Sequence, residues 1–368
     1  MSHEEYMRLA IKEAIKGMGY TNPNPMVGAI IVKDGRIIGK GYHEKYGQLH
    51  AERNAIASCT ESPEGAAIYV TLEPCCHYGK TPPCTEAIIE NKISTVIIGS
   101  SDPNPLVAGN GIKQLQEHGI QVIPDVLKAE CDAINEVFFH YIRTKTPYVV
   151  MKYAMTADGK IAAYTGESKW ITGEKAREHV QHSRHRYAGI MVGIGTVMAD
   201  DPMLDCRLPD GCNPLRIICD TALRTPLTSK IVSTAKEIPT CIATSCKEEE
   251  RLTAYQEKGC EILQIPKQNG HVDLTALMKK LGEKGIDSIL LEGGSGLNYS
   301  ALQAGIVNKV QAYIAPKLFG GETAKTPVGG QGVAFPKDAF FLEKEHITLL
   351  EPDILIEWEV KKDVHRDC

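Results

Sequence analysis

The apolar positions alternate between helix-like and strand-like spacing over the first 143 residues. Apolar residues at helical spacing predict an amphipathic helix over 3–18, and a β-branched run at 27–32 followed by Asp34-Gly35 predicts a hairpin. We expect further helices at 50–58, 85–91, 111–118 and 128–143, and further strands at 67–71, 95–98 and 121–123. This alternation favours an α/β sandwich around one sheet.

The segment Thr144-Lys145-Thr146-Pro147 interrupts this pattern, because proline disfavours helix at the residue before it. We therefore expect two domains, residues 1–146 and 147–368. Alternation resumes beyond the break, with strands expected at 148–153, 190–192, 215–219, 241–244, 288–291, 310–315 and 354–360. The second region lacks a G-x-G-x-x-G opening, so it is not an obvious Rossmann domain.

The composition and charge of the chain argue against nucleic-acid-binding, secreted and membrane-spanning proteins. The 368 residues are 43% hydrophobic and 24% charged, an ordinary globular balance, and the net charge of −5 argues against a nucleic-acid surface. The N-terminus lacks the features of a signal peptide, and no apolar run is long enough for a membrane span. Twelve cysteines without a secretion signal indicate free thiols or metal ligands, so we expect a cytoplasmic protein.

The strongest chemical signal is the triplet His-Ala-Glu at 50–52, followed by Cys75 and Cys84. A catalytic zinc ion takes three protein ligands and keeps a fourth position for water, and His50, Cys75 and Cys84 meet that count. Zinc lowers the pKa of its bound water, which makes hydroxide available. Glu52 lies two residues from His50, so it is the expected catalytic residue that moves the protons of this water.

A second interpretation of these residues is a structural zinc site, which is closed by four protein ligands. Cys76 or His77 would then be the fourth ligand, and the protein would be a zinc-stabilised binding module. Glu52 would have no purpose in such a site.

The arrangement of histidine, glutamate and cysteines is the mark of the zinc nucleobase deaminases, so the chain resembles the cytidine deaminase-like superfamily. It departs from that signature because eight residues, and not two, separate Cys75 from Cys84. With the motifs Asn-Pro-Asn-Pro at 22–25 and Asp-Pro-Asn-Pro at 102–105, this long form resembles the deaminase half of the bifunctional deaminase/reductase family of riboflavin biosynthesis. The resemblance implies these substrate-binding residues: Asn24, His43, His77, Lys80 and Asn104.

Other roles stay open for some of these residues. Asn24 is also a turn residue between two prolines, and His43 could simply end a strand. Lys80 is a candidate for contacting a phosphate, or a solvated loop lysine.

The second region resembles the reductase half of the same family at 152–161, 166–172, 192–202 and 204–207. At 290–298 a β-run leads into glycines and a helix-like stretch, whose first N–H groups can bind phosphate. The resemblance implies a dihydrofolate reductase-like α/β domain that uses NADPH. The implied cofactor-binding residues are Ala154, Trp170, Thr196, Asp200, Gly294, Ser295, Gly296, Leu297, Asn298, Tyr299 and Ser300, and the implied substrate-binding residues are Ser168, Arg184, Leu204, Arg207 and Glu292.

Lys152 is our candidate for a catalytic residue that polarises the reacting sugar carbon, with a salt-bridged lysine at a strand edge as the alternative. The planar fork of arginine suits the phosphate of the substrate, although Arg184 could also be a solvated helix residue. Trp170 could serve in core packing instead of cofactor binding.

The resemblance implies deamination of 2,5-diamino-6-(5-phosphoribosylamino)pyrimidin-4-one at the carbon bearing the 2-amino group, giving 5-amino-6-(5-phosphoribosylamino)uracil. NADPH would then reduce the ribosyl to the ribityl chain. Zn²⁺ and NADPH are the expected cofactors. The expected binding partners are this small-molecule substrate and further copies of the chain in a homo-oligomer. We expect no binding to nucleic acid or membrane. The alternative is a zinc deaminase of another base or nucleotide with a non-catalytic C-terminal domain.

Overall fold

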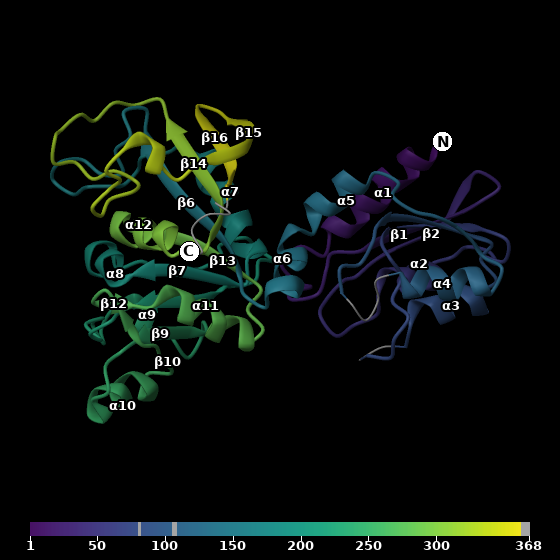
Figure 1. The fold of residues 1–368 in the computed structure, drawn as a ribbon, viewed down its shortest axis with the longest axis horizontal. Coiled ribbons are helices and arrows are strands. Elements are labelled where there is room, and N and C mark those ends of the chain that lie inside the picture. The colour runs from purple at the N-terminus through teal and green to yellow at the C-terminus, as the bar shows by residue number, and fades with distance from the viewer. Residues whose placement is uncertain (80–81, 105–108, 362–368) are drawn as a thin grey trace. The chain divides into compact units, whose positions relative to one another are not determined.

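The computed structural model describes residues 1–79, 82–104 and 109–361. It divides into two compact units, Met1–Lys145 and Thr146–Cys368, each built around its own sheet (Figure 1). The α/β class predicted for both parts of the chain is confirmed.

The first unit has a five-stranded sheet in the order β2-β1-β3-β4-β5. β1 pairs antiparallel with β2 and β3, while β3, β4 and β5 are parallel. The strands are β1 (Gly28–Lys33), β2 (Arg36–Tyr42), β3 (Ala67–Leu72), β4 (Thr95–Ser100) and β5 (Gln121–Ile123). The hairpin at Asp34-Gly35 is therefore confirmed.

Helices cover both faces of this sheet, which gives the predicted sandwich. On one face, buried side chains of α2, α3 and α4 pack on the strands, and on the other those of α1 and α5 do so. The helices are α1 (His3–Ile15), α2 (Ala51–Ala57), α3 (Cys84–Glu90), α4 (Asn110–Glu117), α5 (Lys128–Ile134) and α6 (Glu136–Thr144).

The single helix predicted over 128–143 is wrong, because the chain forms α5 and α6 with a break at Asn135. The side chain of Asn135 is buried, and it accepts a hydrogen bond from the N–H of Met26 and donates one to its carbonyl oxygen, both at 2.9 Å. These bonds satisfy the backbone N–H and C=O groups of Met26, which lies in a loop far away in the sequence, and they hold that loop against the start of α6.

The second unit has a nine-stranded sheet in the order β10-β9-β8-β7-β13-β6-β14-β16-β15. Every neighbouring pair from β10 to β14 is parallel, and β14-β16 and β16-β15 are antiparallel. The strands are β6 (Tyr148–Thr156), β7 (Gly189–Gly193), β8 (Leu215–Cys219), β9 (Thr240–Thr244), β10 (Glu261–Gln264), β13 (Ser288–Gly293), β14 (Val307–Ala315), β15 (Leu342–Leu350) and β16 (Asp353–Val360).

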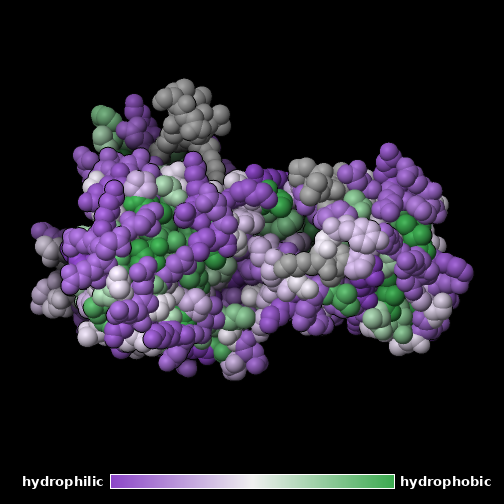
Figure 2. All heavy atoms as spheres, turned by 90° about the horizontal axis from the view of Figure 1, so that it is seen from below, coloured by the Kyte–Doolittle hydropathy of each residue, from purple (hydrophilic) through white to green (hydrophobic). Residues whose placement is uncertain are grey.

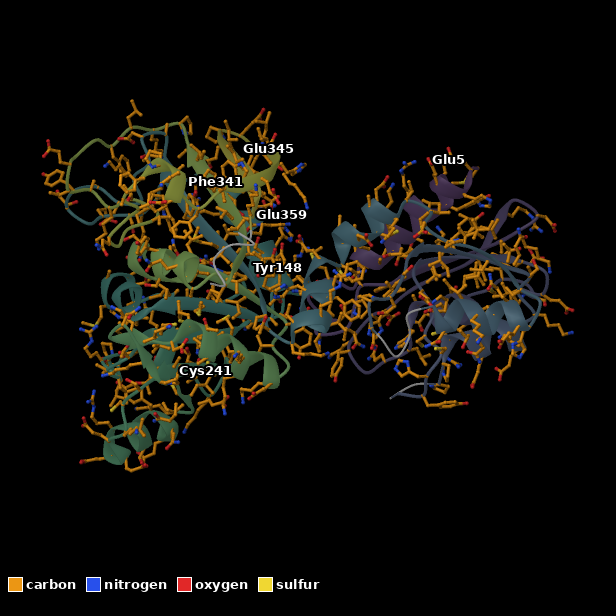
Figure 3. The ribbon with its side chains drawn as sticks, in the orientation of Figure 1. Glu5, Tyr148, Cys241, Phe341, Glu345 and Glu359 are labelled. Atoms are coloured by element: carbon orange, nitrogen blue, oxygen red, sulfur yellow. The ribbon has the colours of Figure 1, made fainter. Side chains whose placement is uncertain are left out.

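Both faces of the parallel part are buried, as expected for strands whose crossovers are helices. Alternate strand residues face α11 and α12 on one side, where Cys241 lies (Figure 3), and α7 to α10 on the other. The helices are α7 (Glu174–Arg186), α8 (Ile194–Asp200), α9 (Lys230–Ser233), α10 (Glu249–Glu257), α11 (Leu274–Glu283), α12 (Ser295–Gln303) and the 3-10 turn Pro336–Asp338. A short hairpin pairs β11 (Lys267–Gln268) with β12 (His271–Val272).

Within the described ranges, no helix is long and apolar enough to cross a membrane. The face drawn in Figure 2 is largely hydrophilic, with smaller hydrophobic areas in both units.

Candidate active sites

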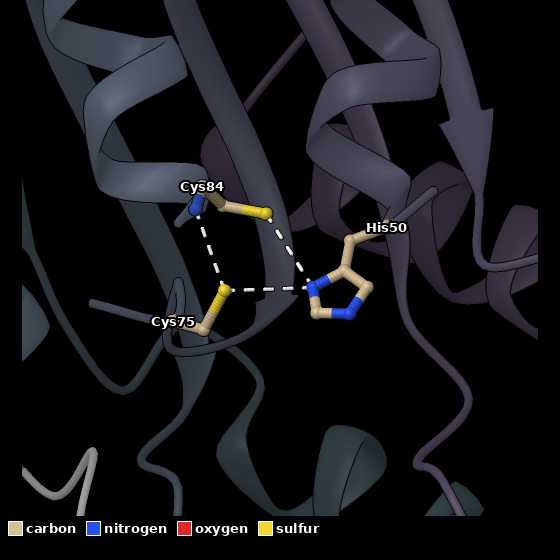
Figure 4. Close-up of side chains that lie close together, drawn as sticks. All are labelled: His50, Cys75 and Cys84. Carbon is tan, nitrogen blue, oxygen red and sulfur yellow. Dashed lines mark hydrogen bonds between the residues drawn. The ribbon is translucent and has the colours of Figure 1, made fainter. Parts of the chain in front are cut away.

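Three predicted metal ligands meet at the helix starts of the first unit (Figure 4). His50 precedes α2, Cys84 begins α3, and Cys75 lies in the segment after β3. The Nδ1 atom of His50 is 3.5 Å from the Sγ atoms of both Cys75 and Cys84. A tetrahedral zinc with its usual bond lengths would hold nitrogen and sulfur about 3.6 Å apart. The three side chains therefore fit this ion.

The charges at this cluster favour a thiolate. The backbone N–H of Cys84, at the start of α3, donates to Cys75 Sγ at 3.3 Å. Hydrogen bonding from Cys84, followed by the hydrogen bond and charge of His50, lowers the pKa of Cys75 to about 4. The hydrogen bond to Cys75 raises the pKa of His50. A thiolate is the form of cysteine that binds metal ions.

Glu52 lies in the first turn of α2 and is only 3% exposed. Burial, and then the negative charge of Cys75, raise the pKa of its carboxyl group. Glu52 lines the same cavity as His50 and Cys75 but is not a member of the ligand cluster. A carboxyl group with a raised pKa beside a ligand cluster can accept and return a proton.

A cavity of about 340 Å³ joins the ligand cluster to four of the predicted substrate-binding residues. The residues on its lining are Asn24, His43, His77 and Asn104, whereas Lys80 lies outside the described residues. His43 Nδ1 is 3.0 Å from the carbonyl oxygen of Leu49, and Asn24 Nδ2 is 3.2 Å from His43 Nε2. The carbonyl oxygen of Leu49 can only accept, so the proton of the His43 ring is on Nδ1. The Nε2 atom of His43 therefore accepts a hydrogen bond from the amide of Asn24, which fixes the orientation of that amide.

Several cavity residues escaped the sequence analysis. Asp102 is the first residue of the Asp-Pro-Asn-Pro motif, so the sequence did contain a motif that could have marked it. Burial raises the pKa of its carboxyl group to about 6. Phe138 and Tyr141 reach the cavity from α6, and no sequence motif marks them. Glu73 also lines the cavity, but its carboxylate accepts the N–H groups of Gly109 and Ile112 and so secures the start of α4.

The second unit contains a cavity of about 1180 Å³ at the carboxyl ends of β7 and β13. Gly293 and Gly294, with φ of 55° and 88°, turn the chain from β13 into α12. A Cβ atom on Gly294 would lie 3.2 Å from Thr196 Oγ1, so the turn is closely packed. The starts of α8 and α12 both reach this cavity, and their N–H groups suit a pyrophosphate.

Most of the predicted cofactor residues line this cavity. The residues on the lining are Thr196, Asp200, Gly294, Ser295, Gly296, Leu297, Tyr299 and Ser300, together with the predicted substrate residue Ser168. The lining also includes Thr221, Gln268, Asn269, His271 and Lys325, which no sequence motif had marked. The cavity therefore joins segments that lie far apart in the chain.

Three predicted cofactor residues are not on the lining of this cavity. Ala154 packs beside the cluster beneath α7, and the amide of Asn298 donates to the carbonyl oxygen of Pro327 at 2.9 Å. Trp170 is 60% exposed, with the guanidinium carbon of Arg177 4.8 Å from its ring centroid. Core packing of Trp170 is therefore wrong, and cofactor binding stays a prediction.

A charged cluster lies between β13, β6 and α7. Arg184 forms a bidentate ion pair with Glu292, with Nε and Nη2 at 2.8 and 3.0 Å from the two carboxylate oxygens. Lys152 Nζ is 3.9 Å from Glu292 Oε2. The Arg184 side chain is only 11% exposed and β6 is a central strand, so a solvated Arg184 and a strand-edge Lys152 are both wrong. The salt bridge that the alternative role of Lys152 included is present, because its ammonium group faces Glu292.

The pKa values in this cluster follow its charges. Burial alone would raise the pKa of Glu292, but Arg184 and Lys152 together bring it down to about 2. Burial lowers the pKa of Lys152, and Glu292 partly offsets this effect.

The two remaining predicted substrate residues differ in exposure. Leu204 is buried with a φ of 52°, and the Arg207 side chain is 60% exposed, with its Nε atom 4.0 Å from Asp205 Oδ1. Arg207 can therefore meet a ligand from solvent.

Comparison with known proteins assigns both units. The family model of the cytidine and deoxycytidylate deaminase zinc-binding region matches residues 1–100, and that of the RibD C-terminal domain matches residues 147–356. The chain is 56% identical to riboflavin biosynthesis protein RibD of Actinobacillus pleuropneumoniae over 360 residues, covering 98% of this chain and 96% of the relative. It is 40% identical to RibD of Escherichia coli over 335 residues, or 88% and 90% of the two chains.

Solved structures agree over the full length. Acinetobacter baumannii RibD is 35% identical with a TM-score of 0.87, covering 98% of this chain and 99% of that one. A diaminohydroxyphosphoribosylaminopyrimidine deaminase/5-amino-6-(5-phosphoribosylamino)uracil reductase of Thermotoga maritima is 38% identical with a TM-score of 0.86 and the same coverage. The predicted fold of a cytidine deaminase-like domain followed by a reductase domain is confirmed, as are zinc and NADPH as cofactors. The chain belongs to the RibD family of bifunctional riboflavin biosynthesis deaminases and reductases.

Proposed function

We propose that the chain deaminates 2,5-diamino-6-(5-phosphoribosylamino)pyrimidin-4-one and then reduces the ribosyl group of the product, 5-amino-6-(5-phosphoribosylamino)uracil, with NADPH. The Thermotoga maritima relative is named for these two activities. The observation that carries the first step is the ligand cluster at 3.5 Å spacing, with buried Glu52 on the same cavity.

In the first unit, His50, Cys75 and Cys84 would hold the zinc ion, which supplies a Lewis acid that lowers the pKa of water. Glu52 would accept the proton of the attacking water and deliver it to the departing amine, a task that its raised pKa supports. Asn24, whose amide is fixed by His43, would hydrogen-bond the pyrimidine. His77, Asn104 and Lys80 would contact the rest of the substrate.

In the second unit, NADPH supplies the hydride, and the protein supplies placement. The starts of α8 and α12 would bind its pyrophosphate, with Thr196 and Ser295 on the lining. Lys152 would polarise the reacting sugar carbon by donating a hydrogen bond from its ammonium group to the attached ring oxygen. It would pass a proton to that oxygen as the hydride reaches the carbon and the carbon–oxygen bond breaks. Arg207 would pair with the substrate phosphate, since its side chain is exposed.

The remaining predicted residues complete the second site. The pocket of the phosphoribosyl group would be shaped by Ser168, Arg184, Leu204 and Glu292. The pocket of the cofactor would be shaped by Ala154, Trp170 and Asn298. Arg184 and Glu292 hold each other, so they would offer the substrate a fixed surface.

A homo-oligomer also belongs to this proposal. Leu349 on edge strand β15 is 71% exposed and pairs with exposed Ile354 on β16, next to the pair of Ile347 and Ile356. Glu345 and Glu359 mark these two strands in Figure 3. Exposed apolar groups on a sheet favour association. Light scattering of a Leu349→Lys protein is expected to give a smaller particle than the wild type, and an unchanged mass would contradict this contact.

A cytoplasmic location is also proposed. No disulfide joins the cysteines of the described residues, as is usual in a reducing compartment. Cell fractionation tests this point.

The central experiment follows ammonia release and NADPH consumption together with zinc and the diamino substrate. We expect ammonia first, and NADPH consumption only after deamination. A Glu52→Gln protein should lose ammonia release by about 10³-fold and should still reduce the supplied deaminated product. Full ammonia release by this protein would refute the role of Glu52. Ammonia release without any NADPH binding would favour the alternative, a deaminase with a non-catalytic second domain.

A further inference from the structure

Lys152 has a second neighbour that its proposed role does not account for. Its Nζ atom lies over the ring of Tyr313, 5.7 Å from the centroid. Tyr313 stands on β14 next to β6, two residues beyond Gln311, the register partner of Lys152. Lys152 and Tyr313 therefore share the face of the sheet that α7 covers.

Tyr313 is held in place at both ends. Its ring is 1% exposed and packs against Ala176 and Val180 of α7 and Leu355 of β16. Its hydroxyl group is 2.8 Å from His179 Nδ1, so a hydrogen bond joins it to α7. A ring fixed in this way presents a constant face to Lys152.

Glu292 alone does not localise the ammonium group. Arg184 approaches both of its carboxylate oxygens at 2.8 and 3.0 Å, whereas Lys152 stands at 3.9 Å. The strong, directional bonds of Glu292 thus go to Arg184. The attraction of an ammonium group to an aromatic face increases as the two are removed from water. Here Tyr313 is 1% exposed and the Lys152 side chain 15% exposed.

The charged and titratable groups around Lys152 come from every neighbouring element. They are Glu292 on β13, Arg184 and His179 on α7, Tyr313 on β14, Glu357 on β16, and Asp205 and Arg207, which reach the pair of Arg184 and Glu292. Burial and Arg184 disfavour the charged form of Lys152, while Glu292 and the ring of Tyr313 favour it.

We propose that Tyr313, anchored by His179, is a positioning residue of the reductase that holds the ammonium group of Lys152 over its ring and directs it at the oxygen attached to the reacting sugar carbon. This inference rests on the proposed role of Lys152. It adds an aromatic residue from β14 that acts on the reaction only through Lys152.

The test uses the full-length protein with supplied deaminated product and measures the single-turnover rate of NADPH oxidation against pH. Phenylalanine at 313, and then phenylalanines with increasing numbers of ring fluorines, keep the shape and weaken the attraction of the ring for cations. We expect Tyr313→Phe to retain most of the rate, because the ring is still held by its packing against α7 and β16 when the hydrogen bond to His179 is lost. The most fluorinated ring should lower the rate about tenfold, with the alkaline limb of the profile moved to lower pH, because Lys152 loses its proton more easily.

Tyr313→Leu should have the same effect with little change in NADPH affinity. The matched control is Tyr255→Leu, which removes another buried tyrosine whose hydroxyl bonds to Leu223 and Thr225, away from Lys152. It should leave the alkaline limb in place. Ammonia release by the first unit should be unchanged in every variant.

Two outcomes separate the inference from the function on which it rests. If Lys152→Met abolishes reduction but the fluorinated series is flat in rate and pH profile, Tyr313 does not position Lys152 and the inference fails alone. If Lys152→Met keeps full turnover, both the role of Lys152 and this inference are wrong. The fluorinated series decides the matter even where Tyr313→Leu does not fold.

Discussion

The two units build their sites in different ways. In the first unit, the ligands and Glu52 come from one stretch, 50–84, and the helix starts of α2 and α3 bring them together. In the second unit, the cavity takes residues from 161 to 340, and the charged cluster joins β6, α7 and β13. A metal site needs a few ligands at fixed spacing, whereas a dinucleotide and a phosphosugar need a long surface. The first kind of site is therefore visible in sequence, and the second depends on strand order.

Metal removal should have the largest effect and should separate the two units. We expect a chelator to abolish ammonia release and to leave reduction of the supplied deaminated product intact, because His50, Cys75 and Cys84 all lie in the first unit. Both activities are measured before and after zinc is restored. Equal loss of both, without recovery, would mean that the units are not independent.

Breaking the charged cluster should mainly affect the second unit. Glu292→Gln leaves Arg184 and Lys152 without their carboxylate, and we expect the second unit to lose about 3 kcal/mol of unfolding free energy. Both tryptophans, Trp170 and Trp358, lie in this unit, so their fluorescence follows its unfolding separately. A loss no larger than that in the exposed control Glu249→Gln would argue against a stabilising ion pair.

The same pair predicts a pH dependence. The pKa of Glu292 is about 2 in the folded protein against an ordinary value of 4.5. Its stabilisation is thus complete above the ordinary value and is lost as the pH falls toward 2. Denaturant unfolding of wild type and Glu292→Gln at several pH values should show that their difference shrinks over this acid range. A difference that stays constant would contradict the lowered pKa.

Asn135 offers the corresponding break in the first unit. Asn135→Ala leaves the N–H and C=O of Met26 unpaired in a buried place, so we expect a loss of about 2 kcal/mol and a weaker substrate affinity through the loop that carries Asn24. Calorimetry and the KM of deamination measure the two effects. Gln116→Ala, at an exposed position on α4 of the same unit, is the control. An unchanged KM would show that the loop keeps its place without Asn135.

Arg207 should have the smallest effect. Arg207→Ala is expected to raise the KM for the deaminated product about tenfold, while NADPH affinity and ammonia release stay unchanged. Arg207→Lys keeps the charge without the planar fork, so its KM should lie between those of the wild type and Arg207→Ala. Equal KM values in all three proteins would remove Arg207 from the substrate site.

The predicted elements match the structure closely where local pattern decides them, as in the hairpin at Asp34-Gly35. The prediction failed at 128–143, because the helix break depends on the pairing of Asn135 with Met26, which is 109 residues away in the chain. Sequence also left Lys152 and Arg184 with alternatives that only burial and strand order could decide.

The sequence by itself determined the two α/β regions, the candidate zinc ligands His50, Cys75 and Cys84, and the position of Glu52 beside them. These features follow from local periodicity and from ligand spacing, which the covalent chain carries. The tertiary structure alone decided that Tyr313 and Glu292 flank Lys152 and that Phe138 and Tyr141 line the deaminase cavity. Such contacts join residues whose separation along the chain carries no signal, since they depend on strand order and on how each helix packs on its sheet.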